Sequence, residues 1–177
     1  TRFALHGGPK YSPDGRFVFF ASRDGWISKY DIYNRKTVSE VRAAINTRNI
    51  AISNDGKYLI VGNYLPNNVV ILNTSDLSPL KVIDAIDKEG NSSRVSAVYN
   101  APPRFSFIVA LKDVKEVWEI PYSDEGGVEV FKGWAHDYKV EAKAEGWKHD
   151  LSKASEQFPV RRIKTDDYLN DFFFDPD

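Results

Sequence analysis

The chain has 177 residues, with 24 Lys and Arg against 25 Asp and Glu. This near-balance excludes indiscriminate binding to nucleic acids, which depends on a basic surface. Hydrophobic residues make up 42% of the chain, enough for a packed core. Cysteine is absent, which excludes disulfides, thiolate metal sites and covalent attachment of a c-type haem within these residues. No apolar run approaches the roughly 18 to 20 residues that span a bilayer, so we expect no membrane span.

Two stretches near the start of the chain resemble each other. Residues 12–20 and 53–61 both begin with a turn sequence that ends in Asp-Gly, continue with a basic residue, and end in a run of β-branched and aromatic residues. Such a pattern predicts a tight turn leading into a buried strand. Each copy is followed by a second strand, at 25–32 and 68–73, and a looser third copy covers 104–110 and 116–120.

Repeated units of about 40 to 45 residues built from short strands are typical of a β-propeller, in which each unit is one four-stranded blade. A β-solenoid or β-sandwich is the alternative. We expect Trp26 and Trp118 to occupy matching positions, a charged insertion loop at about 133–156, and the start of a fourth blade at 160–163. The chain opens at Thr1 rather than Met, so we interpret residues 1–177 as one partial propeller of about three to four blades from a longer protein.

Polar residues recur just after the first buried strand of each unit. They are Arg23 and Asp24, Asn63 and Tyr64, and Lys112 and Asp113. In a propeller, equivalent positions lie at one end of the disc around the axis, so these side chains could converge on one anionic ligand. The alternative is that adjacent Arg-Asp and Lys-Asp pairs form weak surface ion pairs at the hairpins.

A histidine precedes the first unit, in the sequence Leu5-His6-Gly7-Gly8-Pro9. Neighbouring glycines let a bulky flat ligand approach the backbone, and imidazole is a common axial ligand of haem iron. Taken alone, however, a single histidine in a loop is more often an ordinary polar residue.

Six short motifs, in order, carry a family resemblance: Leu5–Lys10, Ser22–Ile27, Asn46–Ile50, Gly62–Pro66, Ser93–Ala97 and Phe107–Lys112. Together they are similar to the haem d1-binding propeller of the cytochrome cd1 nitrite reductases, and more closely to the dihydro-haem d1 dehydrogenases of haem d1 biosynthesis. The resemblance covers nearly the whole chain except 133–156. It implies an all-β, eight-bladed propeller, of which this chain is a part.

The resemblance also implies roles for particular residues. His6 matches the proximal histidine on the d1 iron, Arg23 and Arg48 match arginines that meet the carboxylates of the macrocycle, and Tyr64 matches a tyrosine of the same pocket. Two further basic residues of that end of the blades match less closely, and these are Arg94 and Lys112.

One position departs from the nitrite reductases. Their Leu-His-Asp motif, whose histidine donates a proton to bound nitrite, corresponds here to Leu169-Asn170-Asp171. An amide is not an acid near neutral pH, so Asn170 argues against nitrite reduction. The pair His136-Asp137 lies in the charged insertion, and we do not interpret it as a displaced version of the motif.

We therefore expect a haem d1-binding domain of a periplasmic dihydro-haem d1 dehydrogenase-like oxidoreductase. The alternatives are the d1 domain of a cytochrome cd1 nitrite reductase and a non-catalytic propeller that serves as a protein-binding scaffold. The resemblance implies a tetrapyrrole ligand, haem d1 or its dihydro precursor with its iron, and a c-type haem only in an upstream domain. It further implies an electron-transfer partner, contact with a nitrite reductase, and catalytic residues beyond Asp177, so the fragment alone is expected to be inactive.

Overall fold

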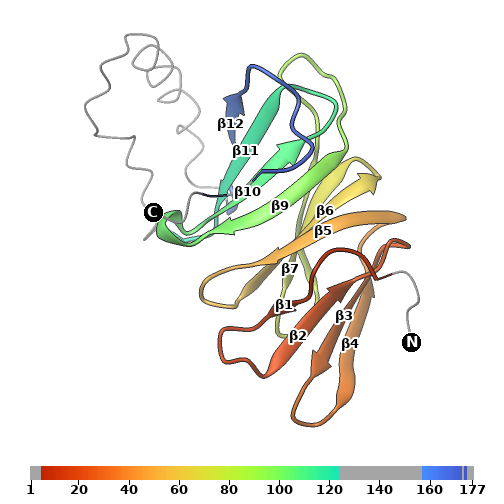
Figure 1. The fold of residues 1–177 in the computed structure, drawn as a ribbon. Helices are drawn as coiled ribbons and strands as arrows, with labels where there is room; N and C mark the ends of the chain where they lie inside the picture. Colours follow the sequence, from red (N-terminus) through yellow and green to blue (C-terminus); the bar gives the residue numbers. More distant parts are fainter. Residues whose placement is uncertain (1–4, 124–156, 173, 175–177) are drawn as a thin grey trace.

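The computed structural model describes residues 5–123, 157–172 and 174, which form three four-stranded antiparallel sheets and one short 3-10 helix (Figure 1). The first sheet contains β1 (Lys10–Tyr11), β2 (Phe17–Ala21), β3 (Trp26–Asp31) and β4 (Lys36–Arg42). The second contains β5 (Asn46–Ile52), β6 (Tyr58–Leu65), β7 (Asn68–Asn73) and β8 (Pro79–Asp84). The third contains β9 (Val95–Ala101), η1 (Pro102–Arg104) at its first turn, β10 (Ser106–Leu111), β11 (Glu116–Pro121) and β12 (Arg161–Lys164).

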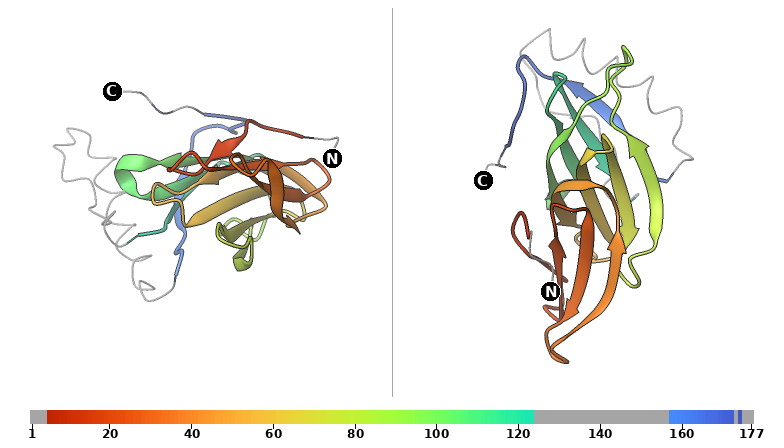
Figure 2. Two further views of the ribbon diagram at one scale, coloured as in Figure 1. Left: turned by 90° about the horizontal axis from the view of Figure 1, so that it is seen from below. Right: turned by 90° about the vertical axis from the view of Figure 1, so that its right-hand side faces the viewer.

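The three sheets follow one another in chain order, from the red and orange first sheet to the green and blue third sheet (Figures 1 and 2). Within each sheet the strands are ordered as in the sequence, which is the arrangement expected of propeller blades. The expected insertion loop and the pair His136-Asp137 lie outside the described residues. Within the described part, no helix is long and apolar enough to cross a membrane.

The repeated turns form as the sequence predicts. The amide of Gly15 donates to the carbonyl of Ser12 at 2.8 Å, and the amide of Gly56 donates to the carbonyl of Ser53 at 3.0 Å. Both glycines have positive φ, which L side chains adopt only with strain. In each turn the aspartate accepts from the backbone amide of the following basic residue at 3.1 Å. The turn chemistry of the two copies is therefore the same.

Two hydrophobic clusters hold the sheets together, and the second sheet contributes to both. Along β6, Leu59 and Val61 belong to the cluster shared with the first sheet, whereas Ile60 belongs to the cluster shared with the third. In β7 the same alternation places Val70 in the first cluster and Ile71 in the second. Because successive side chains of a strand point to opposite faces, a sheet covered on both sides requires an unbroken apolar run. This explains the continuous hydrophobic sequence of both strands.

The expected start of a fourth blade at 160–163 is wrong. Residues Arg161–Lys164 form β12, which pairs with β11 and completes the third sheet. The guanidinium of Arg161 lies 2.6 Å from the carboxylate of Glu119, and both side chains are buried. Residues 124–156 separate two strands of one sheet, so the outermost strand resembled the beginning of a new unit in the sequence.

Trp26 and Trp118 do not occupy matching positions. The last register pair of β2 and β3 is Ala21 with Ile27, and the equivalent pair of β10 and β11 is Ala110 with Val117. Trp26 lies one residue before Ile27, whereas Trp118 lies one residue after Val117. The two tryptophans are thus two positions apart relative to their register pairs, and Trp118 is fully buried whereas Trp26 is partly exposed.

Gly25 is expected to tolerate no side chain. Its φ is +88°, and a Cβ atom there would lie 1.8 Å from the carbonyl oxygen of Ala44, which is backbone and cannot rotate away. We expect Gly25→Ala to destabilise the full-length protein by at least about 3 kcal/mol, measured by chemical denaturation. Gly15→Ala is the matched control, because its φ is +69° with open space around it, and we expect a loss of only about 1 kcal/mol. Equal losses would show that the contact with Ala44 is unimportant.

Candidate functional site

Three residues occupy equivalent positions in the three sheets. At this end of the hairpins, the last residues of β2, β6 and β10 that pair with the following strand are Ala21, Gly62 and Ala110. Two residues beyond each of them come, in order, Arg23, Tyr64 and Lys112. The structure thus confirms that these polar side chains recur at one place in the repeated unit.

Irregularities of strand pairing redirect two side chains of the second sheet. Between β5 and β6, Thr47 pairs with Asn63 and Asn49 pairs with Gly62, so Arg48 is an extra residue on its strand. On β6, Tyr64 is likewise skipped in the pairing, between Asn63 and Leu65. Extra residues of this kind re-aim a side chain away from the regular alternation. The guanidinium carbon of Arg48 then lies 5.9 Å from the centroid of the Tyr64 ring.

A buried polar network supports this part of the second sheet. The hydroxyl of Thr47 donates to the side-chain oxygen of Asn63 at 2.9 Å, and the amide nitrogen of Asn63 donates to the side-chain oxygen of Asn68 at 2.8 Å. Asn63 has no solvent-exposed surface. Because a fully paired buried network is rigid, it fixes the end of β6 that carries Tyr64.

His6 lies between two arginines from different sheets. Its backbone amide donates to the carbonyl of Ala21 at 2.9 Å, which attaches the segment to β2. The Nε atom of Arg23 lies 3.3 Å from Nδ1 of the ring, and Nη1 of Arg48 contacts Nε2. The side chain is half-buried.

The surroundings of His6 favour the uncharged imidazole. Burial lowers its pKa below the ordinary value of 6.5, and the positive charges of Arg48 and Arg23 lower the pKa further. A neutral imidazole has one N–H and one lone pair, so it can accept a hydrogen bond from only one of the two arginines. An anionic ligand that accepted hydrogen bonds from both arginines would remove this mismatch and leave the lone pair for a metal.

Three cationic side chains contact the ring of Tyr64. Besides Arg48, the guanidinium carbon of Arg94 lies 5.4 Å and Nζ of Lys112 lies 5.8 Å from the ring centroid. Arg94 also forms a two-bond ion pair with Asp113, with distances of 2.9 and 2.6 Å. The hydrogen bonds from Arg94 are the largest cause that holds the pKa of Asp113 below its usual range.

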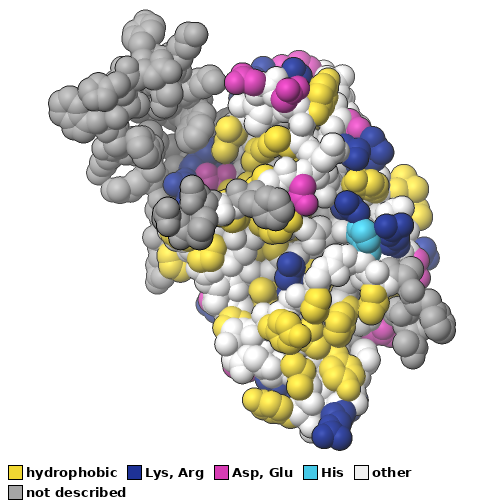
Figure 3. Space-filling model, viewed as in Figure 1, with side chains coloured by type: hydrophobic (Ala, Val, Ile, Leu, Met, Phe, Trp, Pro, Cys, Tyr) yellow, Lys and Arg dark blue, Asp and Glu magenta, His cyan; other side chains and the backbone are white. Residues whose placement is uncertain are grey.

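All six residues singled out from the sequence therefore form one chain of contacts. We call this group the His6 cluster, and its members are His6, Arg23, Arg48, Tyr64, Arg94 and Lys112. Figure 3 shows basic side chains gathered around the histidine on this face. Among the described residues, Arg23, Arg48 and Lys112 form no ion pair with a carboxylate, and Asp113 pairs with Arg94 rather than with adjacent Lys112. Like charges brought together without counter-charges favour binding of an anion.

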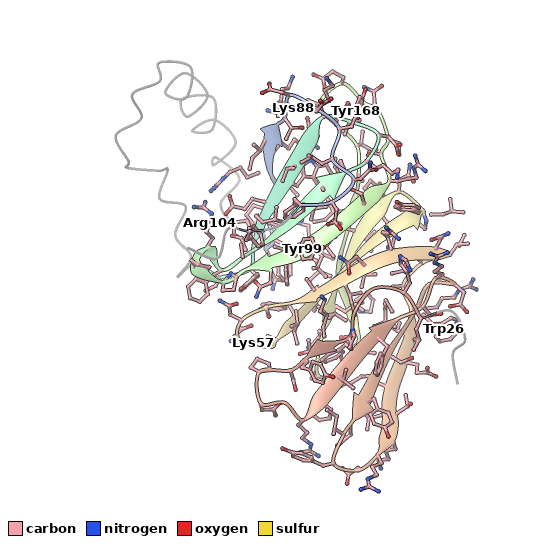
Figure 4. The ribbon with its side chains drawn as sticks, in the orientation of Figure 1. Trp26, Lys57, Lys88, Tyr99, Arg104 and Tyr168 are labelled. Atoms are coloured by element: carbon pink, nitrogen blue, oxygen red, sulfur yellow. The ribbon has the colours of Figure 1, made fainter. Side chains whose placement is uncertain are left out.

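Asn170 lies in residues 165–172, which follow β12 and which we call the returning segment. The hydroxyl of Ser96 donates to the carbonyl of Leu169 at 2.8 Å, and the hydroxyl of Tyr99 donates to Oδ1 of Asp171 at 2.9 Å. Asn170 is therefore held between two residues anchored to β9, and it is exposed. Figure 4 labels Tyr99 on β9. Sequence reasoning did not identify Tyr99, because a tyrosine within an apolar strand is indistinguishable from a core residue.

Comparisons with known proteins give a consistent result. The family model for the cytochrome D1 heme domain matches residues 1–148. Dihydro-heme d1 dehydrogenase from Pseudomonas aeruginosa PAO1 is 51% identical over 177 residues, which is the whole of this chain and 30% of the relative. Nitrite reductase from Stutzerimonas stutzeri is 29% identical over 132 residues, or 71% of this chain and 22% of the relative.

A solved structure of dihydro-heme d1 dehydrogenase NirN in complex with DHE matches with a TM-score of 0.79 and 50% identity, over 99% of this chain and 32% of that one. The match confirms the all-β propeller fold and explains why the three sheets follow one another as blades. The chain spans about a third of the length of these dehydrogenase relatives.

Proposed function

Because the chain belongs to the cytochrome D1 heme domain family, we propose that the His6 cluster binds haem d1 or its dihydro precursor within a dihydro-haem d1 dehydrogenase. The observation that carries this proposal is that Arg23 and Arg48 contact an uncharged histidine, and Lys112 lies over the neighbouring Tyr64 ring, with no carboxylate paired to any of these three cations among the described residues. Haem d1 is a flat, carboxylate-rich ring that contains iron, and it needs this combination of groups.

The residues present fit such a group by their chemistry. The imidazole of His6 keeps a lone pair that would hold the iron. Arg23 and Arg48 carry planar donor forks that match carboxylates, and Lys112 adds a point charge. The ring of Tyr64 orients the cations around it. When bound, the tetrapyrrole iron supplies the redox chemistry, while these residues bind the ring and orient it.

The dehydrogenase is favoured over the two alternatives by separate observations. Identity to the dehydrogenase is 51% over the whole chain, against 29% over part of it for the nitrite reductase. By the family resemblance, Asn170 also replaces the histidine with which a nitrite reductase donates a proton. A scaffold that only bound proteins would gain nothing from directing two arginines at one imidazole, where they repel each other.

The full-length protein tests the proposal when it is loaded anaerobically with dihydro-haem d1 and supplied with an electron acceptor. Removal of two hydrogens from a propionate side chain forms a carbon–carbon double bond; two electrons pass to the acceptor and two protons are released to the acceptor or to solvent. We expect the spectrum of the dihydro precursor to change to that of haem d1. For each ring oxidised, the acceptor should take up two electrons. Binding without conversion would contradict the dehydrogenase function and leave only the binding of haem d1.

Nitrite reduction by the haem d1-loaded protein is expected to be slow. A positioned general acid contributes about 10²- to 10⁴-fold to a rate, and the amide of Asn170 cannot release a proton near pH 7. We expect Asn170→His to raise nitrite turnover measurably, and Asn170→Ala, which introduces no acid, to leave turnover at the low level. Rapid nitrite turnover by the unaltered protein, without oxidation of the dihydro precursor, would instead favour the nitrite reductase alternative.

The remaining features of the proposal rest on the family resemblance. They are a periplasmic location, electron transfer to a c-type haem domain outside these residues, contact with a nitrite reductase, and catalytic residues beyond Asp177.

A further inference from the structure

The returning segment is fixed to the third blade at both ends. At its start, Nζ of Lys115 donates to the carbonyl of Asp166 at 2.8 Å and lies 5.4 Å from the centroid of the Tyr168 ring. At its end, Ser96 and Tyr99 on β9 hold the residues on either side of Asn170. The position of Asn170 therefore depends on side chains of the innermost strand of the blade.

Tyr99 makes the larger number of these contacts. Its hydroxyl donates to Asp171, whose same oxygen also accepts from the amide of Phe172 at 2.9 Å. Its ring contacts that of Phe172 edge to face at 4.9 Å, and that of Phe174 at 6.5 Å. A tyrosine that combines ring packing with a hydrogen bond to a carboxylate orders a segment that has no strand pairing of its own.

Tyr99 also lies next to the His6 cluster. The side-chain amide of Asn49 donates to the carbonyl of Val98 at 3.3 Å, which joins the residue after Arg48 to the residue before Tyr99. The pKa of Tyr99 is raised, first by burial and then by its hydrogen bond to Asp171, while the positive charge of Arg48 acts in the opposite direction. The hydroxyl therefore stays protonated at neutral pH and remains a donor within electrostatic range of Arg48.

We propose that Tyr99 is a positioning residue, which holds the returning segment beside the His6 cluster through its hydroxyl bond to Asp171 and its contacts with Phe172 and Phe174. The segment then presents Asn170 at the side of the bound tetrapyrrole. This inference rests on the proposed function, because it assigns to that site a wall formed by residues 168–172. Sequence motifs do not indicate it, since Tyr99 and Asp171 are 72 residues apart.

The test uses four single variants of the full-length protein and the double variant Tyr99→Phe with Asp171→Ala. Tyr99→Phe removes the hydroxyl and keeps the ring, and Asp171→Ala removes the acceptor. Asp171→Asn keeps an oxygen that can accept from Tyr99. Tyr168→Phe is the matched control, because it removes a hydroxyl from the same segment that has no hydrogen-bond partner among the described residues.

Two readouts are needed, namely hydrogen exchange of the amides in 166–172 without ligand and spectrophotometric titration with haem d1. We expect Tyr99→Phe and Asp171→Ala each to speed hydrogen exchange and to weaken haem d1 binding by about 5- to 10-fold. This is less than the full contribution of a hydrogen bond to a charged group, because the pair is partly exposed to solvent. The double variant should be no worse than Asp171→Ala alone, because that variant already removes the acceptor of Tyr99. Asp171→Asn keeps an acceptor but loses the charge, so its affinity should lie between those of Asp171→Ala and the unaltered protein, whereas Tyr168→Phe should behave like the unaltered protein.

The outcomes separate this inference from the proposed function. If the unaltered protein binds haem d1 and Tyr99→Phe binds it as tightly as Tyr168→Phe, the positioning role is wrong and the proposed function stands. Faster exchange in Tyr99→Phe with unchanged haem d1 affinity also contradicts the role, because the segment would then be no part of the site. If the unaltered protein does not bind haem d1, the proposed function itself fails.

Discussion

Replacing Arg23 and Arg48 together by glutamine is expected to weaken haem d1 binding by about 100-fold. A hydrogen bond to a charged partner contributes about 1.5 to 3 kcal/mol, so two arginine–carboxylate pairs could contribute as much as about 10⁴-fold. Arg23 is exposed, and solvent screening reduces its share. Glutamine keeps a hydrogen-bond donor while it removes the charge. Spectrophotometric titration of the full-length protein measures the change.

The control for this pair is Arg35→Gln with Lys36→Gln. Both residues are exposed at the turn between β3 and β4, so this variant removes the same two charges away from the His6 cluster. We expect less than about a 2-fold change in affinity, because exposed charges separated by more than a Debye length are screened. Equal losses in the two double variants would indicate a general effect of net charge and no specific site.

His6→Ala is expected to change the visible spectrum of bound haem d1 and to weaken its binding by at least about 10-fold. Loss of residues that merely orient a metal ligand already costs about 10- to 100-fold, and loss of the ligand should cost no less. Added imidazole should restore the spectrum by occupying the space of the missing side chain. An unchanged spectrum in His6→Ala would show that another group holds the iron.

The affinity for haem d1 should also depend on pH through His6. Protonation removes the lone pair that would hold the iron, so affinity falls as pH falls through the pKa of His6. Burial and the two neighbouring arginines hold that pKa below 6.5, so the acid loss should have its midpoint below pH 6.5. The residual binding of His6→Ala should lack this step. A midpoint above pH 6.5 would contradict the electrostatic description of the site.

The sequence predicted most of the fold because the repeated signals are local. The turns at Ser12 and Ser53 and the apolar runs after them specify strands without reference to distant residues. The assignment of β12 failed because strand pairing is not local. Arg161 is 42 residues from its partner Glu119, and nothing in the sequence indicates that pairing.

The sequence identified the six residues of the His6 cluster, but not the contacts that join them. Equivalent positions in the repeat identified Arg23, Tyr64 and Lys112, and the glycines beside it drew attention to His6. The family resemblance gave His6 its role and added Arg48 and Arg94. The irregular pairing that redirects Arg48 depends on how two strands meet, which no single-strand pattern reveals. The contact of Tyr99 with Asp171 was missed for the same reason.

The most direct measurement is an experimental structure of the full-length protein with haem d1 bound. We predict that a ring nitrogen of His6 coordinates the iron, that Arg23 and Arg48 turn from the imidazole to carboxylates of the macrocycle, and that residues 168–172 lie at its side. A tetrapyrrole bound elsewhere, or held by other residues while Arg23 and Arg48 still contact His6, would contradict the proposed site.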